Sequence, residues 1–273
     1  MSMIGILHAL ALATYVLAGA LIASSLAVGS REVSRPALFA IVAAVLTHGA
    51  ALAAYTAGYG ELPLVGLAAS ISTLAFLIGV GLLISALLRQ ARPLAVVLIP
   101  LIGMLVLAAL ILGVRPSGDE FEFRGAWFSL HVVTAFVAYA GLAIAFSAGL
   151  LYLLQFRALK EKNFGRAFRF LPPLETLDAV GQRALVLGLG ALSFALLLGW
   201  AWTVRFRASL TLRNPEVIWG VVTWLVFVSA LVARRGGAGG DRRGASAAVA
   251  GFMVVVLAYV VLRVMTASGG LFL

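Results

Sequence analysis

The chain has 273 residues, of which 63% are hydrophobic and 11% are charged. A water-soluble globule of this length cannot bury so much apolar surface, so the composition excludes a soluble enzyme and predicts an integral membrane protein. The formal net charge is +10. Because the positive residues are spread over short loops, with no soluble domain to hold a duplex, they indicate membrane topology and contact with anionic lipid, not nucleic-acid binding. Cysteine is absent, which excludes disulfides and thiolate metal sites.

Eight apolar runs are long enough to cross the hydrocarbon core as helices, which takes roughly 20 residues each. They predict an all-α, polytopic membrane protein that forms a single membrane domain over residues 1–273. The first run is expected to be a retained helix, since it lacks a charged leader region and a small-residue cleavage site. The predicted spans are 3–28, 37–57, 64–88, 94–113, 128–155, 184–204, 216–233 and 245–265.

The distribution of Lys and Arg predicts the orientation. Most of these residues fall in the loops after the first, third, fifth and seventh spans. Positive residues stay on the cytoplasmic side of short loops, so both termini are expected to lie outside. The longest connection, 156–183, interleaves Phe and Leu with Arg and Lys, which favours an amphipathic cytoplasmic segment; a plain basic loop explains it as well. Residues 205–215 form the predicted outer Trp/Arg-rich loop, with arginines in the loop itself and tryptophans in the spans on either side of it.

Small residues recur at four-residue spacing on one face of the fifth span, at Gly141, Ala145 and Gly149. Such a face lets a neighbouring helix approach closely in a membrane. We therefore expect these residues to serve helix packing.

The three histidines are the main candidates for chemistry. By the rise of an α-helix, His8, His48 and His131 would lie about 8, 13 and 5 Å below the outer interface, which is compatible with one shared site. A tyrosine follows each of them two turns along the same helix, at Tyr15, Tyr55 and Tyr139. Histidines inside a membrane are candidates for function because a buried imidazole needs a hydrogen bond, a metal or a cavity. The alternative is a neutral imidazole bonded to a Ser, Thr or Tyr of the next helix.

The tryptophans are also biased toward the predicted outer side. Trp219 lies near that boundary and Trp224 somewhat deeper. Part of this bias is the aromatic belt that anchors helices at an interface. Nearby Arg213 offers a guanidinium that pairs well with carboxylates such as haem propionates.

Two absences narrow the function. No Asp or Glu lies in the middle of a span, whereas ion- and proton-coupled transporters normally need buried carboxylates there. No phosphate-binding loop, nucleophile elbow or zinc motif is present, so hydrolase chemistry has no visible site.

Three stretches resemble the CcsA/HemX-type cytochrome c assembly proteins, closest to the small YpjD-like branch. They are Leu150 to Gln155 (LLYLLQ), Leu171 to Asp178 (LPPLETLD) and Pro215 to Phe227 (PEVIWGVVTWLVF). The resemblance implies eight helices with both termini outside, and an outer Trp-rich loop that helps to hold haem while histidines of neighbouring helices ligate the iron.

Carried over position by position, the resemblance makes this chain a divergent member. Pro215, Trp219 and Trp224 match the Trp-rich motif, and His48 and His131 match family histidines. The family's Trp, Asp and Glu of that motif are replaced by Arg213, Asn214 and Val217, and two further family histidines, near Leu231 and near the C-terminus, have no counterpart here.

The leading hypothesis is therefore a haem-handling protein of the bacterial cytoplasmic (inner) membrane, acting as a chaperone more than as an enzyme. His48 and His131 would ligate iron, with His8 as a substitute ligand. Trp219, Trp224 and Arg213 would shape the outer rim of the site. Its partners would be the lipid bilayer and other cytochrome c assembly proteins or an apocytochrome. Two alternatives stay open at this point: an assembly or regulatory subunit that has lost haem, and, less favoured, a small-molecule permease.

Overall fold

The structure is a computed structural model that describes residues 2–28, 34–87, 92–116, 125–162, 164–206, 215–235 and 239–267. Within these ranges the regular structure is helical and contains no strand. Eight of the helices are long and apolar enough to cross a membrane. The predicted all-α fold with eight spans is thus confirmed, and the outward orientation of the termini stays a prediction.

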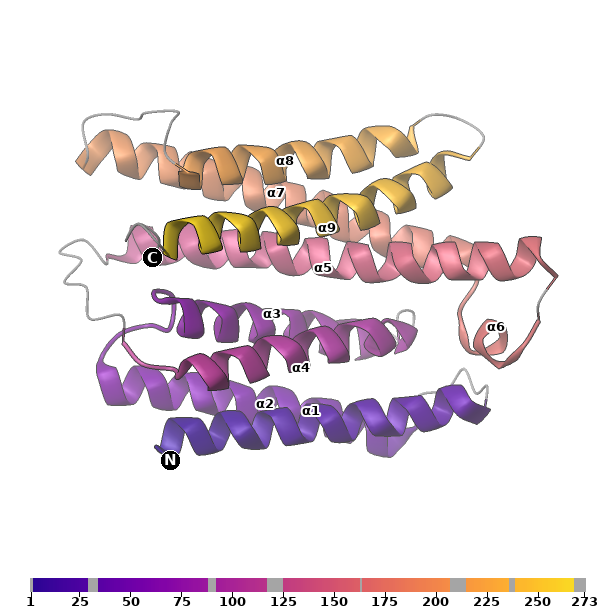
Figure 1. Ribbon diagram of the computed structural model, residues 1–273, viewed down its shortest axis with the longest axis horizontal. Helices are drawn as coiled ribbons and strands as arrows, with labels where there is room; N and C mark the ends of the chain where they lie inside the picture. Colours follow the sequence, from indigo (N-terminus) through magenta and orange to yellow (C-terminus); the bar gives the residue numbers. More distant parts are fainter. Residues whose placement is uncertain are drawn as a thin grey trace. The chain divides into compact units, whose positions relative to one another are not determined.

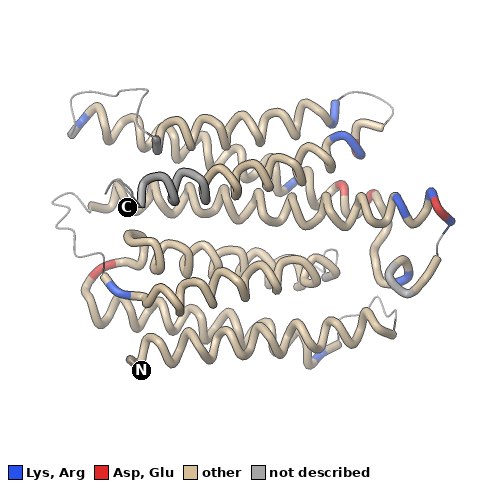
Figure 2. Tube along the Cα trace, in the orientation of Figure 1, with Lys and Arg blue, Asp and Glu red and all other residues tan. Residues whose placement is uncertain are grey.

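Figure 1 shows the helices in chain order. They are α1 (Met3–Val28), α2 (Arg35–Tyr59), α3 (Leu67–Leu87), η1 (Arg92–Leu94), α4 (Ala95–Leu112), α5 (Ala126–Lys160), α6 (Arg166–Phe170), α7 (Leu174–Phe206), α8 (Pro215–Arg234) and α9 (Gly240–Ala267). In Figure 2 most of the described charged residues lie toward helix ends and in connections. Arg183, the tenth residue of α7, lies farther inside its helix.

The chain divides into two compact units. Unit 1 comprises Met1–Gly118 and Leu151–Val180, and unit 2 comprises Asp119–Leu150 and Gly181–Leu273. Helices α5 and α7 each contribute to both. The two units are described separately below, and the expectation of a single membrane domain stays a prediction.

Unit 1 is built on the four helices α1 to α4. Helix α1 packs against α2 and α4, and α3 packs against α2 and α4. Local signals fix the ends of α2: the Ser34 side chain accepts a hydrogen bond from the Ala37 N–H, and Gly60 ends the helix in the left-handed conformation, with φ of 70°. A glycine adopts that conformation without steric cost. The Ser34 cap sets where α2 begins, and Gly60 sets where it ends and where the loop to α3 begins.

Unit 2 packs α5, α7, α8 and α9 around one apolar core. The small residues predicted on α5 lie in this packing. A side chain at Gly141 would meet the backbone of α7 at Ala184 and Gly188, and one at Gly149 would meet the Ala245 carbonyl oxygen of α9 at 2.9 Å. Ala145 between them is fully buried. The prediction of a close-packing face is confirmed, and successive parts of that face serve two different helices.

The connection predicted at 156–183 is mostly helical. Helix α5 continues to Lys160, the short α6 follows, and α7 begins at Leu174 directly after two prolines. A span predicted from hydropathy ends where charged residues begin, whereas a helix can continue into water as long as its backbone hydrogen bonds are formed. Helix α6 packs against α1, and Phe170 is buried. Part of the predicted amphipathic segment therefore contacts protein; its cytoplasmic position stays a prediction.

The structure describes only the ends of the predicted outer loop at 205–215, which stays a prediction. Helix α7 ends at Phe206 and α8 begins at Pro215. Residues 207–214, and with them Arg213 and Asn214, lie outside the described residues.

Candidate functional site

Two of the predicted histidines come together in unit 1. His8 of α1 and His48 of α2 are fully buried, and their ring centroids are 5.7 Å apart. Both rings converge on the hydroxyl of Ser72, in α3. The Oγ atom of Ser72 lies 2.8 Å from Nε2 of His8 and 3.0 Å from Nε2 of His48. One serine thus joins histidines that are forty residues apart in the sequence.

The hydrogen-bond partners fix the proton on each ring. Nδ1 of His8 lies 2.8 Å from the Ile4 carbonyl oxygen, which can only accept, so Nδ1 of a neutral His8 carries the hydrogen and Nε2 is the acceptor. The Ser72 hydroxyl therefore donates to Nε2 of His8. Because the single O–H of Ser72 already donates to His8, the Ser72 oxygen accepts from Nε2–H of His48. The two imidazoles consequently hold opposite tautomers.

The remaining nitrogen of His48 is buried among aromatic rings. Tyr15 packs edge-on to His48 at a centroid distance of 6.0 Å, and Phe76 does so at 5.7 Å. Nδ1 of His48 and the hydroxyl of Tyr15 are both buried, and neither has a hydrogen-bond partner among the described residues. Glycine at 79 leaves room for the Tyr15 hydroxyl, because a Cβ there would collide with it.

This arrangement does not fit iron ligation by His48 through Nε2. That nitrogen is protonated and occupied by Ser72, and the ring is enclosed by His8, Tyr15 and Phe76. A macrocycle at that position would have to break the bond to Ser72 and separate the packed rings. The alternative for an intramembrane histidine, a neutral imidazole bonded to a serine of the next helix, describes His8 and His48 as they stand.

The third histidine belongs to unit 2 and has a different environment. His131, in the second turn of α5, is half-buried, and its Nδ1 lies 2.7 Å from the Ala195 carbonyl oxygen of α7. The carbonyl can only accept, so Nδ1 carries the hydrogen and Nε2 keeps its lone pair. No hydrogen bond from a described residue reaches this Nε2. Metal-ligating histidines typically donate their other N–H to a carbonyl in this way, which fixes the ring and its tautomer.

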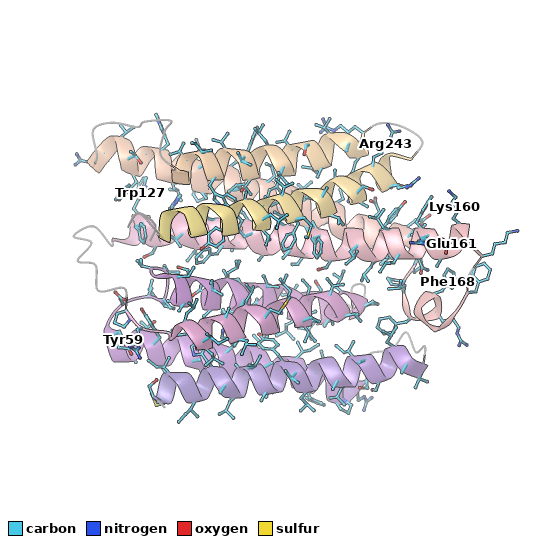
Figure 3. All side chains as sticks on the ribbon, in the orientation of Figure 1. Tyr59, Trp127, Lys160, Glu161, Phe168 and Arg243 are labelled. Atoms are coloured by element: carbon cyan, nitrogen blue, oxygen red, sulfur yellow. The ribbon has the colours of Figure 1, made fainter. Side chains whose placement is uncertain are left out.

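A glycine of α7 makes room for this imidazole. A Cβ at Gly199 would lie 2.8 Å from Cε1 and 3.1 Å from Nδ1 of His131. One turn earlier on α5, the Trp127 Nε1–H donates to the Leu198 carbonyl oxygen at 3.1 Å; Figure 3 labels this tryptophan near the start of α5. Two ring N–H groups of α5 thus bind successive turns of α7 and hold the His131 ring in place.

The two tryptophans predicted for the rim both join helices of unit 2. Trp219 Nε1–H donates to the Tyr139 hydroxyl at 2.9 Å, which links α8 to α5. Trp224 Nε1–H donates to the Ser193 hydroxyl at 2.9 Å, which links α8 to α7. Among the described residues neither indole hydrogen-bonds to His131. Their observed contacts are helix packing, and a role at the rim stays a prediction, as does the role of Arg213.

Sequence reasoning missed Ser72, Ala195, Gly199 and the contact of Trp127. Ser72 carries a weak signal, since it is a polar residue about as far into its helix as His8 is into α1. The Ala195 carbonyl is a backbone group, so no residue type identifies it. No cluster of three or more His, Cys, Asp or Glu side chains occurs within the described ranges.

Comparison with known proteins identifies the family of this chain. The family model described as "Cytochrome C assembly protein" matches residues 7–268. The chain is 28% identical over 151 residues to the cytochrome c biogenesis protein CcsA of Guillardia theta, covering 50% of each chain. It is 29% identical over 133 residues to that of Chlamydomonas reinhardtii, covering 49% of this chain and 36% of the relative. This chain spans half or less of the length of these relatives, but the family model covers nearly all of it. The chain therefore belongs to the cytochrome c assembly protein family.

Proposed function

We propose that this chain binds haem at the outer end of unit 2 and handles it during cytochrome c assembly in the bacterial inner membrane. Family membership supports the process, and the geometry of His131 supports the site. This imidazole is the one whose Nε2 is unprotonated and free of hydrogen bonds from described residues, while its Nδ1–H is fixed by the Ala195 carbonyl. Through this nitrogen His131 would hold the haem iron, as histidines do in other haem proteins.

The other residues have supporting parts in this proposal. Gly199 and Trp127 keep the His131 ring against α7. Trp219 and Trp224 hold α8 to its neighbours and would form the apolar rim, and Arg213 would pair with a propionate. Ligation by His48 or by His8 is not carried into the proposal, because Ser72 occupies Nε2 of both.

The described side chains include no buried carboxylate that would couple transport to an ion, which weighs against a permease. The remaining alternative is an assembly subunit without haem. The hydrogen-bonded state of His8 and His48 favours that alternative, because two of the three histidines are satisfied by Ser72 without a cofactor.

The absorption spectrum of the purified protein distinguishes a haem-binding protein from a haem-free assembly subunit. The protein is placed in lipid nanodiscs, loaded with ferric haem and passed through a size-exclusion column, and empty nanodiscs serve as the control for haem dissolved in lipid. We expect a Soret band that stays with the protein and is shifted from that of the control. A colourless protein that co-purifies with a stoichiometric partner would establish the haem-free subunit instead.

A further inference from the structure

The His8–Ser72–His48 group is more than a satisfied polar contact, because its hydrogen bonds all run in one direction. Nε2–H of His48 donates to Ser72, Ser72 donates to His8, and Nδ1–H of His8 donates to the Ile4 carbonyl. This series of hydrogen bonds begins at an acceptor, Nδ1 of His48, which is buried and unpartnered among the described residues. A proton can enter a series of hydrogen bonds that all run in one direction and start at a free acceptor.

We propose that His8, Ser72 and His48 form a buried proton relay that carries positive charge from His48 to His8 within unit 1. A hydronium ion gives its proton to the Nδ1 lone pair of His48 and leaves as water. The Nε2–H bond of His48 breaks and its proton passes to the Ser72 oxygen, while the hydroxyl proton of Ser72 passes to Nε2 of His8. His48 ends neutral with its hydrogen on Nδ1, Ser72 again carries one hydrogen, and His8 holds the added proton as an imidazolium.

The surroundings make each end suitable for its part. At the His48 end of the relay, the Tyr15 hydroxyl is a second buried polar atom without a described partner, and the Tyr15 ring contacts that of His48. A water molecule at that end would satisfy both atoms, as buried polar groups require. At the other end the Ile4 carbonyl accepts from the charged ring of His8.

The charges around the relay also favour His8 as the place where the proton is held. Helices α3 and α4 carry no titratable side chain. Besides His8 and His48, helices α1 and α2 carry Tyr15, Tyr55, Tyr59 and, at the far end of α2, Arg35. Tyr55 packs against Ile4 and donates to the Glu61 carboxylate at 2.7 Å. Glu61 is the one acidic residue of the described stretches 2–28, 34–87 and 92–116. Within these three stretches the negative charge thus lies toward His8, near the start of α1; the other described acidic residues of unit 1 belong to its segment 151–180 and are Glu161, Glu175 and Asp178.

Nitrogen-15 NMR of the haem-free protein, labelled at histidine and held in nanodiscs, tests the relay directly and independently of haem binding. At neutral pH we expect the hydrogen on Nδ1 of His8 and on Nε2 of His48. On acidification His8 should become doubly protonated, and in the same titration step the hydrogen of His48 should move from Nε2 to Nδ1. A His48 that becomes an imidazolium before His8, or that keeps its tautomer while His8 charges, would overturn the proposal.

Substitution of Ser72 supplies the matched comparison. Ser72→Ala should abolish the coupling, so that His48 no longer changes tautomer when His8 charges, and Ser72→Thr should retain it because the hydroxyl is kept. Ser147→Ala is the control, since Ser147 is equally buried but donates only to the Ala143 carbonyl of its own helix. Coupling that survives Ser72→Ala would show that Ser72 does not carry the proton. If that variant does not fold, the wild-type titration and Ser72→Thr still decide the matter.

Discussion

Replacing Gly199 with alanine is expected to weaken haem binding about 10- to 100-fold, the usual cost of disturbing a group that orients a metal ligand. The added Cβ would lie 2.8 Å from Cε1 of His131. The imidazole must then move off α7 and lose its bond to the Ala195 carbonyl. A spectroscopic haem titration of the protein in nanodiscs measures the change in Kd.

Gly190→Ala is the matched control for this prediction. Gly190 lies on the same helix, and a Cβ there meets nothing within 4 Å. Both substitutions raise helix propensity by a similar amount, so a difference between them reports the contact with His131. Equal affinity of the two variants would mean that the orientation of this ring does not matter for haem.

Replacing Gly149 with leucine is expected to have the largest effect on stability. Its Cβ would lie 2.9 Å from the Ala245 carbonyl oxygen, and a backbone atom in a helix cannot turn aside as a flexible side chain can. Helix α9 would have to shift away from α5. Overpacking of this kind costs about 1–3 kcal/mol, and more where backbone must move. The free energy of unfolding, measured by titration with a denaturing detergent, should fall accordingly.

Gly190→Leu again provides the comparison, because that position is exposed and open. It should leave the unfolding free energy close to that of the wild type. If Gly149→Leu were as stable as Gly190→Leu, the close approach of α5 and α9 would be wrong.

Composition and hydropathy predicted the membrane bundle well, because the bilayer acts on every residue of a span. The Gly141–Ala145–Gly149 face was predictable for a similar reason: four-residue spacing places small side chains on one side of a helix whatever packs there. Helix ends were predicted less well. Span five was expected to stop at residue 155 and span six to begin at 184, whereas α5 reaches Lys160 and α7 starts at Leu174, since hydropathy marks the lipid boundary and not the last backbone hydrogen bond.

The candidate site was predicted only in part. Counting turns along each helix placed the three histidines at similar depth, but it could not tell which groups on other helices they meet. The distinction between His48 and His131 depends on such groups, the Ser72 hydroxyl and the Ala195 carbonyl. The pattern of a single sequence does not identify a hydroxyl in a third helix or a backbone oxygen as a hydrogen-bond partner. Tertiary packing therefore decides which ring nitrogen of each histidine is available to a ligand.

The central claim is that His131 ligates the haem iron, and rescue by imidazole tests it most directly. His131→Gly removes the ring and leaves a space that free imidazole can enter. We predict that the haem-loaded variant loses the shifted Soret band of the wild type and regains it when imidazole is added, while His48→Ala and His8→Ala keep that band throughout. A His131→Gly protein with an unchanged spectrum, or loss of the band in His48→Ala, would contradict the account.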